Sequence, residues 1–149
     1  MDKIDRKILA VLQANARASL QEIGQAVGLS TSPCWERIRK LEAARVIEGY
    51  TVRLNAQALG LADTVMVQVT LDSHSDNTLE RFGETLAAIP EVIEAYLVSG
   101  EYDYLLRVAV KDTRDYERLL RERLYKIKGI RHSKSSFVLR TLKKADLPL

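Results

Sequence analysis

Residues 28–42 read Gly-Leu-Ser-Thr-Ser-Pro-Cys-Trp-Glu-Arg-Ile-Arg-Lys-Leu-Glu, and this stretch decides how the first third of the chain folds. It predicts a helix that begins with hydroxyl side chains and with Pro33, a residue favoured in the first helical turn. Either Ser30 or Ser32 can be its N-cap. At about 100° per residue, the apolar side chains share one side of this helix, and they are Cys34, Ile38 and Leu41. The opposite side is polar and basic.

Two further helices are predicted before this one. The first covers about residues 3–15, with Asp2 as its N-cap and apolar residues at helical spacing. The second begins after Ser19, because residues 19–22 have the form of a capping box. Gly28 then stands where a left-handed residue ends a helix. Two helices joined by a glycine turn, the second with a polar outer face, are typical of a helix-turn-helix.

The outer face of the third helix is expected to contact DNA. A B-DNA major groove admits one helix, and short side chains at its N-terminus allow close approach to phosphates and base edges. Arg37 on the flank, with Arg39 and Lys40, is expected to contact phosphates or guanines. The full predicted DNA-contact set is Ser30, Thr31, Ser32, Pro33, Glu36, Arg37, Arg39 and Lys40. An ordinary solvated helix is the alternative interpretation.

The residues beside this outer face are expected to serve the fold. Val46–Val52 predicts a pair of short strands with a turn at Gly49, which makes the head a winged helix-turn-helix. Cys34 is expected to be a small core residue. Trp35 lies at the edge of the apolar side and is expected to pack against the first helix or the wing.

Composition and charge exclude several classes of protein. The 149 residues are 46% hydrophobic and 29% charged, as in an ordinary globular protein. The single Cys34 excludes an intramolecular disulfide, and with His74 and His132 it leaves little material for a metal site or for histidine catalysis. The longest apolar runs, such as Ile8–Leu12, are too short to span a bilayer and do not resemble a signal peptide. We therefore expect a cytoplasmic protein without a metal or a membrane segment.

Positive charge is concentrated in the first third of the chain. Residues 1–53 carry nine Lys/Arg and six Asp/Glu, a net charge of +3, whereas residues 54–149 carry fourteen of each. A local basic excess is expected of a surface that contacts nucleic acid. So small an excess fits an ordinary protein surface equally well.

The rest of the chain predicts the order strand, helix, strand, strand, helix, strand, which is the ferredoxin-like pattern. The predicted elements are a strand at Thr64–Leu71, a helix capped by Asp76 and ended by Pro90, strands at Val92–Ser99 and Tyr102–Val110, a helix from Asp112 or Thr113 to Gly129, and a strand at Ile130–Leu139. The expected fold class is thus α+β. The expected domains are the helix-turn-helix at 1–53, a linker at 54–62 and a ferredoxin-like domain at 63–149.

A ferredoxin-like domain leaves one face of its sheet uncovered. Met66 and Gln68 are expected on that face, where exposed apolar residues favour a partner. The most economical partner is a second copy of the chain, because most oligomers are symmetric. We therefore expect at least a homodimer, which also brings two helix-turn-helix units to two DNA half-sites.

The turn at residues 99–104 is the candidate effector site. Glycine permits a tight turn and exposes backbone amides that can bind a carboxylate, Asp103 can receive an ammonium group, and serines on the last strand can add hydroxyls. The predicted effector set is Ser99, Gly100, Tyr102, Asp103, Tyr104, Ser133 and Ser135. These are the groups that an α-amino acid needs, although a plain hairpin turn with polar residues has the same composition.

Both motifs resemble one known family. Residues 28–42, followed by Val-Ile-Glu-Gly-Tyr at 46–50, resemble the helix-turn-helix of the leucine-responsive/asparagine-regulator (Lrp/AsnC) family. The turn at 99–104 resembles the Gly-x-x-Asp-Tyr turn of that family's amino-acid-sensing domain. The matches lie in register from Asp5 to about Lys143, and Ser133 and Ser135 fall where the family often has Thr-x-Thr.

The resemblance implies a nucleoid-associated transcriptional regulator of amino-acid metabolism. It implies binding to double-stranded DNA, a small amino acid as effector rather than a cofactor, and dimers that often stack into octamers. No catalysis is implied, and the sequence pairs no nucleophile with a base. Two alternatives share this architecture: a tetrapyrrole (siroheme-type) decarboxylase, which needs His and Arg residues near a bound macrocycle, and an architectural DNA-binding protein without a ligand.

Overall fold

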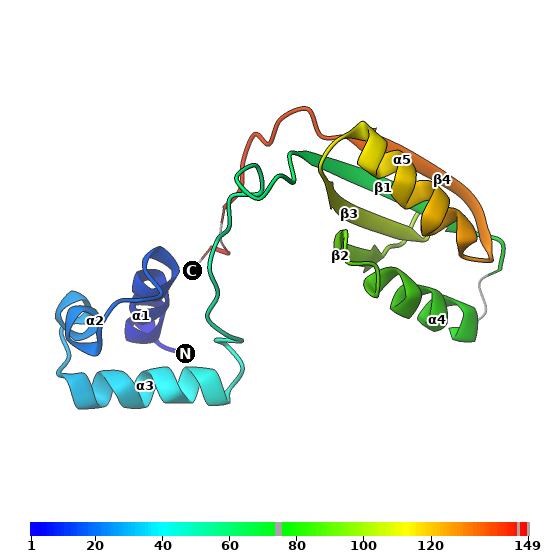
Figure 1. Ribbon diagram of the computed structural model, residues 1–149. Coiled ribbons are helices and arrows are strands. Elements are labelled where there is room, and N and C mark those ends of the chain that lie inside the picture. The colour runs from blue at the N-terminus through cyan, green and yellow to red at the C-terminus, as the bar shows by residue number, and fades with distance from the viewer. Residues whose placement is uncertain (74–75, 146, 149) are drawn as a thin grey trace. The chain divides into compact units, whose positions relative to one another are not determined.

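The computed structural model describes residues 1–73, 76–145 and 147–148 (Figure 1). The chain divides into two compact units, Met1–Leu54 with Lys143–Leu149, and Asn55–Leu142. The last residues of the chain group with the first unit, whereas the sequence prediction placed them in the second domain. One physical reason is a hydrogen bond of 3.1 Å, in which the side chain of Gln13 donates to the carbonyl of Leu147.

The first unit, here called the helical unit, contains α1 (Lys3–Ala14), α2 (Leu20–Val27) and α3 (Thr31–Ala43). Asp2 caps α1 and Ser19 caps α2, each within a capping box, as a carboxylate three residues later returns to the amide of the cap. Gly28 ends α2 at φ 75°, the left-handed conformation that its position predicts. Ser30 is the N-cap residue of α3, which decides between the two candidates, although its side chain makes no capping bond.

The core of the helical unit follows the predicted apolar side of α3. Its buried residues are Ile8, Leu9, Ile23, Cys34, Ile38 and Leu41. Gly24 allows the close approach between α2 and the turn, because a Cβ there lies 2.5 Å from the carbonyl oxygen of Leu29. Burial also raises the pKa of the Cys34 thiol, which keeps it protonated and confirms it as a core residue.

The predicted wing is wrong. Residues 44–62 are all described, and none of them lies in a strand. The amides of Val46 and Ile47 both donate to the carbonyl of Leu41, so they close the C-terminus of α3 and are not available to a strand partner. Farther along, the hydroxyl of Tyr50 donates to the carboxylate of Glu42 at 2.9 Å. The apolar residues of this stretch therefore extend from α3 as an irregular segment.

The second unit, here called the ferredoxin-like unit, is a four-stranded antiparallel sheet with two α-helices, as predicted. Its elements are β1 (Asp63–Leu71), α4 (Asp76–Ala87), β2 (Val92–Leu97), β3 (Tyr104–Val110), α5 (Thr113–Glu122), a 3-10 turn η1 (Leu124–Lys126) and β4 (Ile130–Phe137). The strand order is β2-β3-β1-β4. Asp112 caps α5 through the amide of Asp115. The side chain of Asp76, the predicted cap of α4, lies outside the described residues, as does His74.

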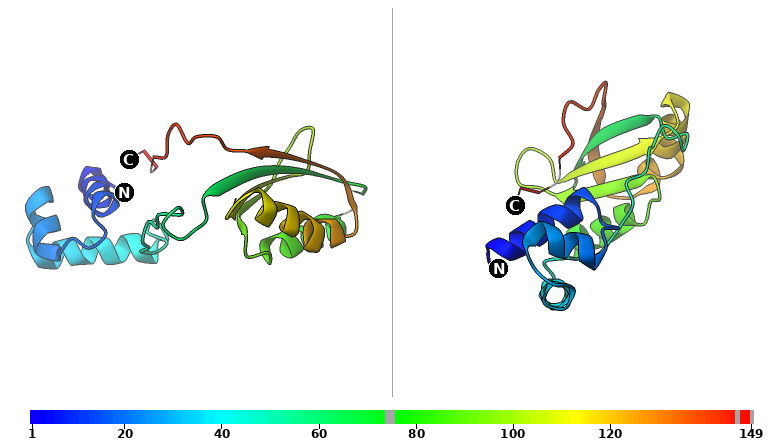
Figure 2. Two further views of the ribbon diagram at one scale, coloured as in Figure 1. Left: turned by 45° about the horizontal axis from the view of Figure 1, so that its top comes forward. Right: turned by 90° about the vertical axis from the view of Figure 1, so that its left-hand side faces the viewer.

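Both α-helices cover the same face of the sheet (Figure 2). Alternate residues of β1 point into the core beneath them, from Val65 to Leu71, as its alternating pattern predicts. Among the described residues of this unit, no helix covers the opposite face. The register places Met66 opposite Arg107 and Gln68 opposite Leu105 on that uncovered face, which confirms the predicted orientation of β1.

Candidate functional site

The outer face of α3 presents the predicted DNA-contact residues to solvent. All of them are exposed except Arg37, which is half-buried. The opposite side of α3 is held against α1 and α2 by its buried apolar residues. The helix is thus anchored on one side and free on the other, which is the arrangement that insertion into a groove requires.

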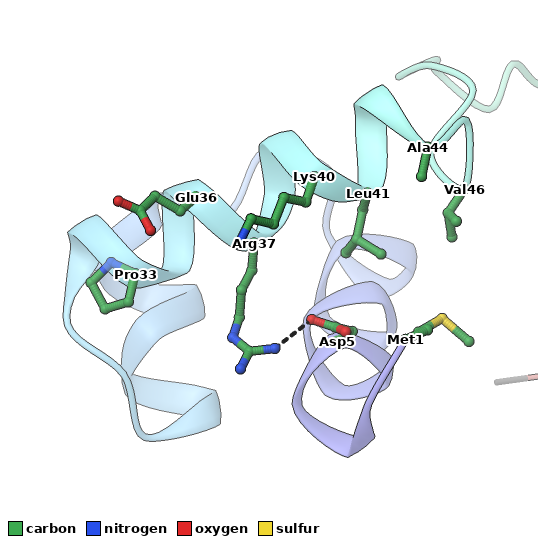
Figure 3. Close-up of a pocket in the computed structure, with 9 residues that line it drawn as sticks. All are labelled: Met1, Asp5, Pro33, Glu36, Arg37, Lys40, Leu41, Ala44 and Val46. Atoms are coloured by element: carbon green, nitrogen blue, oxygen red, sulfur yellow. Dashed lines mark hydrogen bonds and ion pairs between the residues drawn. The ribbon is translucent and has the colours of Figure 1, made fainter.

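Arg37 connects α3 to the start of α1. Its guanidinium Nη1 lies 2.7 Å from Asp2 Oδ2 and 2.8 Å from Asp5 Oδ1, and Figure 3 shows the second of these contacts. The pKa of each aspartate is lowered, first by the backbone N–H that its carboxylate accepts in the capping box and then by Arg37. This cluster of Asp2, Asp5 and Arg37, here called the N-terminal clamp, links α3 to the start of α1.

A groove lies beside the clamp, between α3 and the start of the chain (Figure 3). Its volume is about 510 Å³. Lys40 and Glu36 lie along its α3 wall, and Met1 lies on the opposite wall. The ammonium group of Lys40 is therefore on the exposed side of α3, but on the flank nearer α1.

Trp35 does not pack as expected. Its side chain is 47% exposed, and no wing exists to cover it. The guanidinium carbon of Arg39 lies 4.9 Å from the centre of the indole ring, one helical turn along α3. Sequence reasoning missed this pair because Trp35 sits at the border between the apolar and polar sides of the helix.

The candidate effector turn is a loop of residues 98–103 between β2 and β3, since β2 ends earlier and β3 begins later than predicted. The amide of Val98 donates to the carbonyl of Asp103 at 2.9 Å and closes the loop. Gly100 has a φ of 139°, which a residue with a side chain rarely adopts, and space around its Cα is open. Ser99 and Tyr102 belong to the same loop.

Asp103 attaches this loop to the end of the central strand. Its amide donates to the carbonyl of Val69 at 2.9 Å, and its carboxylate Oδ2 accepts from the amide of Leu71 at 2.7 Å. The carboxylate therefore serves the fold whether or not it also binds a ligand. Nothing local in the sequence indicates these partners, which lie more than thirty residues upstream in the chain.

Tyr104 lies inside the core of the ferredoxin-like unit. Its hydroxyl donates to the carbonyl of Leu79 at 2.5 Å, and its ring centre lies 5.3 Å from that of Phe82. Burial, and then the charge of Asp103, raise the pKa of Tyr104. One side of the ring still lines an open depression of about 620 Å³ between α4 and β2, with Gly83 and Leu97.

Ser133 and Ser135 are not beside the turn. The register places them opposite Val69 and Val67, so both point to the face that the helices cover. The hydroxyl of Ser135 shares a hydrogen bond with that of Tyr116. The turn continues into β3 on one side of β1, and the serines lie on the other side, a separation of two strand spacings or roughly 10 Å.

The described residues hold no metal site and no membrane span. Among them, no three His, Cys, Asp or Glu side chains are grouped so that they could bind a metal ion. Nor does any described helix have the length and apolar character needed to cross a membrane.

Comparison with known proteins also divides the chain into two parts, but it places the last residues in the second part, as the sequence predicts. The model of the AsnC-type helix-turn-helix domain matches residues 1–42, and that of the Lrp/AsnC ligand binding domain matches residues 64–148. The chain belongs to the Lrp/AsnC family. It is 38% identical over 146 residues to the leucine-responsive regulatory proteins of Klebsiella pneumoniae and Escherichia coli, covering 98% of this chain and 89% of each relative.

Solved structures of Lrp/AsnC regulators have the same fold. An AsnC family transcriptional regulator from Agrobacterium tumefaciens is 40% identical, with a TM-score of 0.94 over 99% of this chain and 97% of its own. A transcriptional regulator from Neisseria meningitidis, solved as a complex with L-methionine, is 33% identical, with a TM-score of 0.93 over 99% and 96%.

Membership in the Lrp/AsnC family confirms the resemblance and the α+β fold class. The chain is a transcriptional regulator that joins a DNA-binding helix-turn-helix to a ligand-binding domain. These relatives are regulatory proteins, which favours the regulator over the decarboxylase alternative.

Proposed function

We propose that this protein binds operator DNA through the outer face of α3 and that an amino acid bound by the ferredoxin-like unit changes that binding. The observation that carries the proposal is the difference between the two sides of α3: buried residues anchor one side in the core, and exposed cations occupy the other. A cation that the fold does not use is available to a phosphate or to the O6 and N7 atoms of guanine.

Arg39 and Lys40 are the leading DNA contacts of the set Ser30–Pro33, Glu36, Arg37, Arg39 and Lys40. No ion pair holds either of these two side chains among the residues that the structure describes. The exposed N-terminal turn of α3 adds small side chains and backbone amides next to a phosphate. Arg37 is proposed to act chiefly through the N-terminal clamp, which holds α3 against the start of α1.

The amino acid is proposed to bind at the loop of residues 98–103. Amides around Gly100 hold its carboxylate and Asp103 receives its ammonium group, with Ser99, Tyr102 and Tyr104 around them. The complex of the Neisseria relative with L-methionine supports an amino-acid ligand. Since β1 separates Ser133 and Ser135 from this loop, they complete the site only where a second copy contributes them. Charge-assisted bonds allow a small ligand to bind with little apolar contact.

Assembly follows from the uncovered face of the sheet. We propose a homodimer through the face that carries Met66 and Gln68, with Leu105 beside them, and further stacking up to an octamer. Two-fold symmetry then presents two copies of α3 to two half-sites about one helical turn apart, or a multiple of it. Light scattering at micromolar concentration tests this, and a 16.8 kDa monomer contradicts it.

One series of measurements tests both binding functions. Selection from random duplex DNA supplies an operator, and a thermal-shift screen of the twenty amino acids identifies ligands, because a ligand of the native state raises stability. Arg39→Ala and Lys40→Ala are expected to lose roughly tenfold or more in operator affinity, as one lost base or phosphate contact implies. Arg121→Ala, which removes another exposed arginine, on α5, is the matched control and is expected to bind as the wild type does.

The outcomes separate the candidate functions. Operator affinity that changes with one amino acid supports the proposal. Tight DNA binding whose affinity none of the twenty amino acids changes favours the architectural alternative. Equal operator affinity in the wild type, Arg39→Ala and Lys40→Ala places the DNA-contact surface elsewhere.

A further inference from the structure

Trp35 is an indole ring on the solvent side of a DNA-contact helix. It is the single tryptophan of the chain, and its side chain is 47% exposed. The core of the helical unit is complete without it, because Cys34, Ile38 and Leu41 already fill the inward side of α3. The fold therefore leaves this ring on the face that is proposed to contact DNA, where a base can cover it.

The indole ring already holds one partner, Arg39. Its guanidinium carbon lies 4.9 Å from the ring centre, within the range of a cation–π contact. No carboxylate pairs with Arg39 among the described residues, whereas two carboxylates neutralise Arg37. Trp35 and Arg39 also line one open depression of about 270 Å³, together with Glu36, Lys40 and Ala43. The ring and the cation therefore share the outer face of α3.

We propose that Trp35 is a specificity-determining residue of α3, which orients Arg39 toward a guanine and contacts the thymine methyl of a neighbouring base pair. The inference rests on the proposed DNA-binding function. A guanidinium stacked on an aromatic ring keeps its in-plane N–H donors directed outward, and these donors match guanine O6 and N7. The apolar edge of the ring suits the C5 methyl group of thymine, the one apolar group in the major groove.

The two roles predict different effects on specific and non-specific binding. Removing the ring leaves the charge of Arg39 in place, so affinity for unrelated DNA and the salt dependence of binding are expected to stay the same. Affinity for the operator is expected to fall about two- to fivefold from the lost cation–π contact alone, and further when the methyl contact is lost as well.

The first test uses the fluorescence of the unmodified protein. Because Trp35 is the single tryptophan, its emission reports on this site and on no other. Saturating operator DNA is expected to shield Trp35 from quenching by acrylamide, and unrelated DNA is expected to shield it less. Equal quenching with and without operator overturns the inference.

The second test is a set of variants of the full chain. Trp35→Phe keeps a ring and is expected to retain most of the operator preference, whereas Trp35→Leu is expected to lose it. Tyr125→Leu removes an exposed aromatic residue from the other unit and is the matched control. Circular dichroism and a thermal melt establish that each variant is folded.

A double-mutant cycle with Arg39→Gln decides whether the ring acts through the arginine. If it does, Trp35→Leu costs less operator affinity in the Arg39→Gln background than in the wild type. Additive losses overturn the orienting role, and an unchanged preference in Trp35→Leu overturns the whole inference. A wild-type protein that selects no DNA sequence overturns the proposed function itself, and this inference with it.

Discussion

The outer face of α3 and the loop between β2 and β3 use their polar residues in opposite ways. On α3, Arg39 and Lys40 extend from a helix whose backbone bonds are made within the helix itself. At the loop, Asp103 binds the amide of Leu71 and Tyr104 binds the carbonyl of Leu79. A helix leaves its outward side chains available for a ligand, whereas the end of a hairpin takes up polar side chains to satisfy neighbouring backbone groups.

The two units also differ in the size of their cores. Among the described residues, fourteen buried side chains form the core of the ferredoxin-like unit and six form that of the helical unit. Mutations in the larger core are therefore expected to have the larger effects on stability, and mutations on the face of α3 to affect binding instead. Trp35 lies in the helical unit, so its fluorescence follows that unit alone.

The largest effect is expected from Leu106→Ala in β3. This side chain is fully buried between the sheet and its helices, and its truncation is expected to destabilise the ferredoxin-like unit by about 2–5 kcal/mol. Urea unfolding followed by far-UV circular dichroism measures the loss. Leu142→Ala, at an 83% exposed position, is the matched control and is expected to change little. If Leu106→Ala shifts the urea midpoint measured by Trp35 fluorescence as much as the one measured by circular dichroism, the division into two cores is contradicted.

The next effect separates the structural and ligand roles of Asp103. Asp103→Leu leaves the partly buried amide of Leu71 without an acceptor, at an expected cost of about 1–3 kcal/mol in unfolding free energy. Asp103→Asn keeps an acceptor oxygen and is expected to preserve most of that stability. It nevertheless removes the charge proposed to bind the ammonium group, so calorimetry is expected to show a loss of amino-acid affinity. Full affinity in Asp103→Asn places the ligand elsewhere.

Tyr104→Phe is expected to have a smaller effect than either change at Asp103. The variant keeps the ring against Phe82 and removes the hydrogen bond to the carbonyl of Leu79, a net loss of about 0.5–1.5 kcal/mol. If Tyr104 is only structural, amino-acid affinity measured by calorimetry stays at the wild-type level. A large loss of affinity with unchanged stability assigns its hydroxyl to the ligand.

Local patterns predicted what local forces determine. The caps at Asp2 and Ser19, the glycine end of α2 and the alternation of β1 each involve residues within a few positions of one another, and each was confirmed. The prediction of a wing was wrong because β-branched residues at 46–52 favour a strand, but they do not show whether a second strand is present to pair with it.

The details of the candidate sites depend on contacts between distant residues. The partner of Asp103 is Leu71, and that of Ser135 is Tyr116, so the spacing of either motif cannot show that these polar groups are already engaged. The predicted packing of Trp35 was wrong for a geometric reason. Helical periodicity separates the two sides of a helix but does not assign residues at their border to either side. The sequence contained one indication of the N-terminal clamp. Two aspartates, Asp2 and Asp5, stand at the start of α1, and such a pair favours a cation nearby.

The smallest effect is expected at the N-terminal clamp, where Arg37→Gln keeps a long polar side chain and removes its charge. Because Asp2 and Arg37 are partly exposed to solvent, the melting temperature of the helical unit, followed by Trp35 fluorescence, is expected to fall by a few degrees at most. The pH dependence of the melting temperature is a more specific test of the clamp than its change at a single pH. The folded-state pKa values of Asp2 and Asp5 lie below their ordinary value of 3.8.

A lowered folded-state pKa means that the clamp stabilises the helical unit fully above the unfolded value of 3.8, and that this contribution is lost as the pH falls through the folded-state values. The difference in melting temperature between the wild type and Arg37→Gln is therefore expected to be constant near neutral pH and to shrink below about pH 4. Arg39→Ala is the contrasting variant, because it removes from the same helix a cation that no carboxylate pairs with among the described residues, so its difference in melting temperature from the wild type is expected not to change with pH. A pH-independent difference for Arg37→Gln shows that the aspartates do not act through Arg37, and the helical unit then depends on its apolar core alone for the orientation of α3.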